Sequence, residues 1–340
     1  MMVRTLLVTL CLLMSAFQLQ AADPPPKPPE LSLNNPGSEL WREVRQRDGE
    51  VTGVTQVRSP GAEVLVNVSG QSWREYRMEQ LIPTAASAIF IVLFMILMFR
   101  VLGGRINLSE GRSGMRILRF TNSQRAAHWT TAILFVTLAI TGLVLLLGRN
   151  YLIPILGPQG FGVLASTAKF LHAYLGPLFV FALTWLFVLF VRGNMPSPRI
   201  DLQWVLKGGG LFGSHAHADR YNAGEKLWFW VASIGGLAVI VSGLVLDFPI
   251  FGQTRATMEF YHLIHSVAAV VLIVFAIGHI FMGTAALEAT FEVMKTGYCD
   301  ANWAKEHHDI WYEKVKDTAE PAPSEEEGAM ATRHKAADNA

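Results

Sequence analysis

The sequence predicts an all-α membrane protein in which a four-helix transmembrane core follows one extra amino-terminal transmembrane helix. Two observations carry this prediction. The 340 residues are 51% hydrophobic and only 16% charged, with a mean hydropathy of +0.32. Five apolar runs are each long enough to cross a bilayer as a helix. A soluble globular domain is therefore excluded, and the formal net charge of +1 gives no reason to expect a nucleic-acid partner.

The chain begins with features typical of exported proteins. Residues 1–22 contain Arg4, a short apolar stretch and the small residues Ala21 and Ala22, which predicts a secretory signal peptide. Residues 23–80 open with the extended spacer PPPKPP and contain the β-like patches VTGVTQV and EVLVNV. We expect an exported region there, and its sequence indicates no chemistry.

The five apolar runs are expected to span the membrane, and the loops between them differ in basic residues. Arginine and lysine gather in the loops after the first and third runs and after the fifth, which predicts that these loops are cytoplasmic and the amino-terminal region periplasmic. Arg74 and Arg77 are exceptions, since they precede the first run on the exported side. Residues 317–340 are poor in bulky apolar residues and are expected to form a disordered cytoplasmic tail. The expected spans are 81–101, the extra helix, and then 127–148, 163–191, 227–248 and 259–287.

Cysteine usage excludes several kinds of redox site. Cys11 lies in the leader and Cys299 after the last apolar run, so the mature chain is expected to keep one thiol. A disulfide framework, a cysteine-bound iron–sulfur cluster and a covalent CxxCH haem site all need more cysteines than this.

Four histidines, His128, His172, His265 and His279, lie in or at the ends of apolar runs, where an imidazole is costly unless it is paired or ligated. His265 and His279 are 14 positions apart, which on a helix means about 21 Å along the axis and about 40° around it. One helix face thus presents an imidazole near each surface of a hydrocarbon core about 30 Å thick. These four residues are predicted to be the axial ligands of two haem irons, so that two histidines bind each iron.

The predicted orientation sorts the four ligands by depth. His128 pairs with His279 toward the cytoplasm, and His172 pairs with His265 toward the exported side. Two imidazoles leave no open iron position, which suits single-electron transfer. His262, one turn before His265, is expected to face away. Four other histidines are expected to be solvated surface residues: His215, His217, His307 and His308. Four glycines within the spans would let either a haem or a neighbouring helix approach closely: Gly142, Gly176, Gly243 and Gly278. Three arginines either bind haem propionates or only mark the cytoplasmic side: Arg116, Arg119 and Arg125.

A second candidate site lies at the cytoplasmic start of the fourth run, in DRYNAGEKLWFW. Tyr221, Asn222 and Glu225 offer hydrogen-bonding groups beside Trp228 and Trp230, a mixture that can hold a quinone head group. An ordinary helix start, with Asn222 as the cap and the tryptophans as an interfacial belt, explains the same residues. Composition alone favours the helix start.

Several motifs together resemble the gamma subunit, a cytochrome b, of respiratory formate dehydrogenases. They are RAAHW, KFLHAYLG, RYNAGEKLWFW, LIHSVAAVVLI and NWAKEHHDIWY, and they follow the family order between about residues 119 and 315. Cytochrome b subunits of nickel–iron hydrogenases and thiosulfate reductases are similar. The leader, residues 23–80 and the first span precede this region. The role of residues 23–110 stays open.

The resemblance implies a di-haem cytochrome b core over 119–315, with two b-type haems on the four histidines. It also implies an iron–sulfur beta subunit and a molybdenum or tungsten catalytic alpha subunit as partners on the exported side, and menaquinone or ubiquinone as electron acceptor in a bacterial inner membrane. Its quinone site matches Asn222, Gly224 and Glu225 here. Glutamine is common in the family where this chain has Glu225, and the carboxyl group either relays a proton or is without consequence.

Three rival functions are open at this stage. A non-redox membrane anchor would not need the His265 and His279 register, and a transporter would need broken helices or a repeat that the sequence does not show. A cytochrome b of a hydrogenase or thiosulfate reductase complex differs only in its partner.

Overall fold

The computed structural model describes residues 51–52, 64–66, 68–210, 216–250 and 252–323. The predicted signal peptide and most of the predicted exported region lie outside these residues. Two short strands within the β-like patches, β1 (Val51–Thr52) and β2 (Val64–Val66), pair antiparallel and belong to a separate compact unit. The remaining elements form the second unit, which carries both candidate sites.

Five helices in the described residues are long and apolar enough to cross a membrane. Each predicted apolar run lies largely inside one of them, so the all-α fold class is confirmed. The first span begins earlier than the predicted residue 81, because α3 and a π-helical turn, η1, continue directly into α4. The elements are α3 (Val68–Tyr76), η1 (Arg77–Leu81), α4 (Ile82–Leu102), α5 (Asn122–Tyr151), α6 (Ile153–Phe190), α8 (Ala223–Asp247) and α9 (Arg255–Phe281).

Local sequence explains where the core helices begin. Thr121 before α5 and Asn222 before α8 each form a capping box with the third helical residue, Gln124 and Glu225 respectively. Within α6, Gly157 has a positive φ of 69° and is followed by Pro158, so the helix is kinked at that point. The predicted link between the second and third spans is therefore mostly helical.

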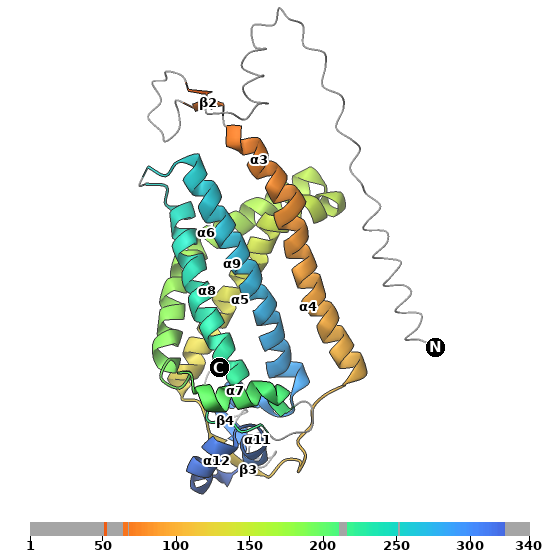
Figure 1. Ribbon diagram of the computed structural model, residues 1–340, viewed down its shortest axis with the longest axis vertical. Helices are drawn as coiled ribbons and strands as arrows, with labels where there is room; N and C mark the ends of the chain where they lie inside the picture. Colours follow the sequence, from red (N-terminus) through yellow and green to blue (C-terminus); the bar gives the residue numbers. More distant parts are fainter. Residues whose placement is uncertain (1–50, 53–63, 67, 211–215, 251, 324–340) are drawn as a thin grey trace, which may run out of the picture. The chain divides into compact units, whose positions relative to one another are not determined.

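Helices α5, α6, α8 and α9 pack in sequence order into a four-helix bundle, and α4 lies against α9 (Figure 1). Small residues allow this close packing. A Cβ at Gly235 of α8 would lie 2.9 Å from Leu272 of α9, and Gly236 meets Leu183 of α6 in the same way. Thr131 of α5 donates to the carbonyl oxygen of Ala182 in α6 at 3.0 Å, which satisfies a hydroxyl group inside the bundle.

Short elements gather at one end of the bundle, which we call the capped end (Figure 1). A three-stranded sheet in the order β4, β3, β5 joins segments far apart in the sequence. The sequence predicts that the tail is disordered from residue 317, but Glu320–Pro321 forms a strand that pairs with β3. Residues 324–340 lie outside the described part of the chain. The elements at this end are β3 (Met115–Leu118), α7 (Pro198–Leu206), η2 (Gly208–Gly210), η3 (Met282–Ala286), α10 (Thr290–Thr296), β4 (Tyr298–Asp300), α11 (Ala301–His307), α12 (Asp309–Val315), η4 (Lys316–Thr318) and β5 (Glu320–Pro321).

Candidate functional site

The four predicted histidines meet as two pairs at two levels of the bundle. The ring centroids of His172 and His265 are 6.0 Å apart, and those of His128 and His279 are 6.2 Å apart. Histidine nitrogens bind metals at about 2 Å, so two imidazoles on opposite sides of one metal have centroids about 6 Å apart. Both pairs therefore have a spacing that fits bis-imidazole ligation, and the predicted pairing agrees with the distances.

A cavity of about 420 Å³ lies beside the pair farther from the capped end. It is lined by His172 and His265, by mostly apolar residues of α5, α6, α8 and α9, and by the polar residues Lys169, Asp247, His262 and Ser266. A Cβ on Gly176, which also lines this cavity, would meet no atom within 4 Å. The space and its apolar wall fit a flat hydrophobic macrocycle better than a hydrated ion.

Hydroxyl groups on the neighbouring helices orient the imidazoles of this pair. Nδ1 of His172 lies 2.9 Å from Thr141 Oγ1, and the Thr141 hydroxyl donates to its own helix at Thr137 O. Nδ1 of His265 lies 3.0 Å from Val239 O and 3.1 Å from Ser242 Oγ. These acceptors assign the ring proton to Nδ1 and leave the Nε2 lone pair free to bind a metal.

Two of the glycines noted in the sequence serve the imidazoles directly. A Cβ on Gly142 would lie 3.2 Å from Cε1 of His172, and a Cβ on Gly243 would lie 3.2 Å from Cε1 of His265. Each glycine directly follows the hydroxyl residue that contacts the same imidazole. The same device, a hydroxyl residue and a glycine on one helix facing a histidine on the next, thus occurs in α5 with α6 and in α8 with α9.

The pair nearer the capped end has a different surrounding. His279 stacks on Trp228 with centroids 5.2 Å apart, and His128 contacts Trp129 edge to face. Nδ1 of His128 is buried and has no hydrogen-bond partner among the described residues. Aromatic packing, instead of a hydroxyl network, positions these two rings.

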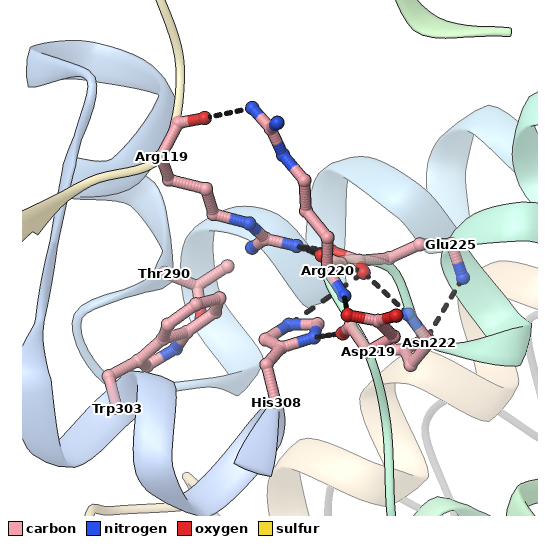
Figure 2. Close-up of polar contacts among 8 residues, drawn as sticks. All are labelled: Arg119, Asp219, Arg220, Asn222, Glu225, Thr290, Trp303 and His308. Carbon is pink, nitrogen blue, oxygen red and sulfur yellow. Dashed lines mark hydrogen bonds and ion pairs between the residues drawn. The ribbon is translucent and has the colours of Figure 1, made fainter. Parts of the chain in front are cut away.

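A polar cluster lies at the start of α8 (Figure 2), about one turn before Trp228, the residue that stacks on His279. Arg119 is 3% exposed, and its Nη2 donates to Glu225 Oε1 at 3.0 Å and to Arg220 O at 2.6 Å. Arg220 in turn donates to the carbonyl oxygen of Arg119. The guanidinium of Arg119 also lies over aromatic rings, which favour a cation at this position: Phe120, Tyr221, Trp303 and Trp311.

Asn222, Gly224 and Glu225, the predicted quinone residues, are all part of this helix start. Asn222 Oδ1 accepts from the Glu225 amide at 2.9 Å, and Glu225 Oε2 accepts from the Asn222 amide at 3.0 Å. The capping function considered from composition is therefore real. About a third of the Glu225 side-chain surface (36%) is exposed, and the carboxylate lies within electrostatic range of His279. The carboxyl group can thus cap the helix and still face a ligand.

His308 corrects the expectation of a solvated surface histidine. Its side chain is 1% exposed; Nδ1 donates to Asp219 O at 2.8 Å, and Nε2 lies 3.7 Å from Glu225 Oε2 (Figure 2). Burial, with a further contribution from Arg119, lowers the pKa of His308 to about 3, so the ring is neutral. Trp303, Ala304, His308 and Trp311 recur at a helical spacing that could have indicated this burial, although the structure divides them between α11 and α12, with His308 at the break.

Two other expectations need correction. His262 does not face away from the site. It lines the same cavity as His265, and this cavity therefore reaches one turn beyond His265 toward the start of α9. Arg119 and Arg125 are engaged by protein groups, Arg125 through Met294 O, Lys295 O and Asn122 Oδ1, and Arg116 pairs with Glu320. These contacts engage all three arginines, although Nε of Arg119 is buried and has no hydrogen-bond partner among the described residues. His217 is half exposed beside Asp309, as expected of a surface histidine, and His215 lies outside the described residues.

Comparison with known proteins now identifies the family. A family model described as prokaryotic cytochrome b561 matches residues 119–297, which include all four histidines. The chain belongs to this family. The cytochrome is 33% identical over 212 residues to the Escherichia coli K12 protein named formate dehydrogenase, cytochrome b556(fdo) subunit, covering 60% of this chain and 95% of that relative.

Two further relatives carry similar names. The nitrate-inducible cytochrome b556(Fdn) subunit of formate dehydrogenase from Escherichia coli K12 is 31% identical over 224 residues, 62% of this chain and 97% of the relative. The cytochrome b556 subunit of formate dehydrogenase from Haemophilus influenzae is 29% identical over 209 residues, 58% of this chain and 82% of the relative. A cytochrome b of this family carries b-type haem, and the two histidine pairs are the places where the described residues fit that group.

Proposed function

We propose that this cytochrome is the membrane subunit of a formate dehydrogenase complex, which passes electrons through two b-type haems to a quinone. The observation that carries the proposal is the pair of bis-imidazole sites at two levels of one bundle, in a chain whose relatives are named as cytochrome b556 subunits of formate dehydrogenases. His172 and His265 would hold one haem, and His128 and His279 the other. The partners would be an exported iron–sulfur subunit and a catalytic subunit containing molybdenum or tungsten.

Haem iron between two imidazoles supplies reversible one-electron transfer, since no coordination position is open to oxygen or substrate. The protein holds each ring at a fixed angle, with Thr141, Ser242 and Val239 fixing the exported-side pair. Apolar helix faces exclude water around the pairs, which keeps the electrons from side reactions. Formate oxidation delivers two electrons, and quinone reduction consumes two electrons and two protons.

Quinone reduction would take place near the capped end, beside Asn222, Gly224 and Glu225. Glu225 faces open space, lies within electrostatic range of His279 and has Arg119 and His308 on its other side. Its carboxylate would take up a proton from the cytoplasm and pass it to a quinone oxygen. Arg119 would hold the carboxylate in place between these events.

Spectra of membranes test the function directly. After haem-replete expression with the partner subunits, formate should produce a reduced-minus-oxidised spectrum with b-type haem bands. His172→Ala or His265→Ala should remove one haem, and His128→Ala or His279→Ala the other, in a pyridine haemochrome assay. Two unchanged haems in any of these variants would remove that residue from the ligand set. Reduction by hydrogen but not by formate would transfer the proposal to a hydrogenase complex.

Glu225→Gln tests the proposed proton transfer. The amide retains an acceptor for the Asn222 amide but cannot give up a proton in this pH range, so quinol formation should slow about 100-fold or more. Reduction of the haems by formate should stay normal, because it precedes the proton step. Glu110→Gln, which alters an exposed ion pair with Lys305, is the matched control. Normal quinol formation in Glu225→Gln would exclude the carboxyl group from the reaction.

A further inference from the structure

Arg77 belongs to the amino-terminal helical segment that precedes the family match, and it has an incompletely satisfied guanidinium group. It begins the π-helical turn between α3 and α4. Its Nη2 donates to Leu145 O of α5 at 3.4 Å, while its Nε is buried and has no hydrogen-bond partner among the described residues. A buried N–H group of a cation without an acceptor is costly, so this one calls for an explanation.

The position of Arg77 points to the cavity that contains His172 and His265. Leu145, whose carbonyl oxygen Arg77 contacts, lines this cavity and lies one turn from Gly142, the glycine against the His172 ring. His262 also lines it and lies within electrostatic range of Arg77. The ring of Trp73 in α3 packs edge to face on His262, with centroids 5.4 Å apart. The amino-terminal segment therefore reaches the wall of this cavity at two points.

The charges around this wall are mostly positive. Arg149 lies within electrostatic range of Arg77, and Lys169 lines the cavity. Within the residues that the structure describes, no ion pair with an acidic side chain involves Arg77, Arg149 or Lys169. Asp247 is the acidic residue of the cavity lining, and it interacts electrostatically with His172. Like charges gather in apolar surroundings only at a cost, which an anion in the cavity would offset.

We propose that Arg77 binds a propionate carboxylate of the haem held by His172 and His265. Haem b carries two propionates, and a guanidinium group is well suited to a carboxylate. The inference rests on the proposed function, because it requires haem in this cavity. It gives the amino-terminal segment a role in the cofactor site, beyond that of an additional membrane span.

The test is a redox titration of the full-length haem-loaded chain. A nearby cation stabilises the added electron, so Arg77→Gln should lower the midpoint potential of the haem that His172→Ala and His265→Ala remove. The other haem should keep its potential. Redox-difference infrared spectra should show a shifted propionate carboxylate band in Arg77→Gln. Arg77→Lys, which retains the charge but loses the planar fork, should give a smaller drop. Arg74→Gln, an exposed arginine of the same helix, is the control and should match the wild type.

Wild-type potentials and carboxylate bands in a folded Arg77→Gln would overturn the inference. If Arg77→Gln did not fold, wild-type potential and band in Arg77→Lys would overturn it equally. A colourless wild type, or histidine variants that keep both haems, would instead contradict the proposed function. The two failures are thus distinguishable.

Discussion

At the residue scale, His172 and His265, the pair predicted to lie on the exported side, owe their geometry to small groups that leave room for the rings and accept their protons. Thr141 and Gly142 on α5 face His172, and Ser242 and Gly243 on α8 face His265. Each hydroxyl donates to its own helix, so its oxygen can accept from Nδ1. The ligand face of each imidazole is thereby fixed before a metal binds.

Gly142→Ala and Gly243→Ala should each weaken haem binding at this site. The added Cβ would lie 3.2 Å from an imidazole Cε1, and the hydrogen bond at Nδ1 limits how far the ring can shift, so it must tilt. We expect the purified variants to lose a large part of one haem per chain in the pyridine haemochrome assay. Gly162→Ala, where a Cβ meets no atom within 4 Å, should retain both haems. Equal haem content in all three would contradict the steric argument.

Thr141→Val should change the electronic properties of the haem while preserving the shape of the site. Without the acceptor for Nδ1–H, the imidazole of His172 becomes a weaker electron donor at Nε2. The oxidised iron is then less stabilised, so the midpoint potential of the exported-side haem should rise. Redox potentiometry checks this expectation, with Thr137→Val as a control on the same helix. A lowered potential would show that Thr141 is not an acceptor for this ring.

At the element scale, the capped end combines segments that lie far apart in the chain. Strand β3 pairs with β4 and β5, joining residues 115–118 to 298–300 and 320–321. Trp303, Trp311 and Tyr221 pack together here and enclose Arg119. Burial raises the pKa of Tyr221 to about 12, so its hydroxyl stays neutral beside the two arginines. The start of α8, with Glu225, is thus fixed by the carboxyl-terminal elements.

His308 should make the stability of this end pH-dependent. Its pKa is lowered from 6.5 to about 3 by burial, so the unfolded chain binds a proton before the folded chain does. Stability is complete above about pH 6.5 and is lost at up to about 1.4 kcal/mol per pH unit as the pH falls toward 3.

Hydrogen exchange of amides 301–315, compared at about pH 7.5 and 5.5, measures this loss. Amide protection should fall more steeply with acid in the wild type than in His308→Asn. The variant is expected to be less stable at neutral pH, so the slopes are compared and not the absolute values. His217→Asn, at a half-exposed site, is the control. Equal slopes in wild type and His308→Asn would show that the ring is not held neutral.

The spans could be predicted because each is one long apolar run, and the histidine pairs because the predicted orientation gives each histidine its depth. His265 and His279 share a face of α9, and that fact needs no tertiary structure. The capped end could not be predicted in the same way, since the pairing of β3 with β4 depends on segments separated by most of the bundle. Arg119 illustrates the limit: as one arginine in a basic loop it indicates topology, and only the packed aromatic rings show that it is buried.

At the scale of the whole molecule, the two histidine levels and the asymmetry of charge define a direction across the membrane. Loops at the capped end carry the clustered basic residues, such as Arg112, Arg116 and Arg125, which predicts that this end is cytoplasmic. Electrons entering at His172 and His265 and leaving near His279 would then move inward. Charge transfer in this direction works against about 2.3 kcal/mol per 100 mV of membrane potential, which a strong reductant such as formate can supply.

Cysteine labelling tests this orientation, and the chain is well suited to it. Cys299 is 1% exposed, and burial raises the pKa of its thiol to about 11, so it should react slowly with maleimides. Gln159→Cys places a thiol on an exposed position of α6 at the end opposite the cap, and Arg199→Cys places one on exposed α7. Both variants should carry Cys11→Ser, so that a retained leader adds no signal.

An impermeant maleimide should label Gln159→Cys in intact spheroplasts and Arg199→Cys only in inverted vesicles. Both positions are exposed, so a difference in labelling reports the side of the membrane and not the reactivity of the thiol. The chain that carries Cys11→Ser alone should remain unlabelled in both preparations. The reverse pattern would place His128, His279 and Glu225 on the exported side. Electrons from an exported donor would then enter at the His128 and His279 pair, and proton uptake from the cytoplasm by the Glu225 carboxyl group would be ruled out.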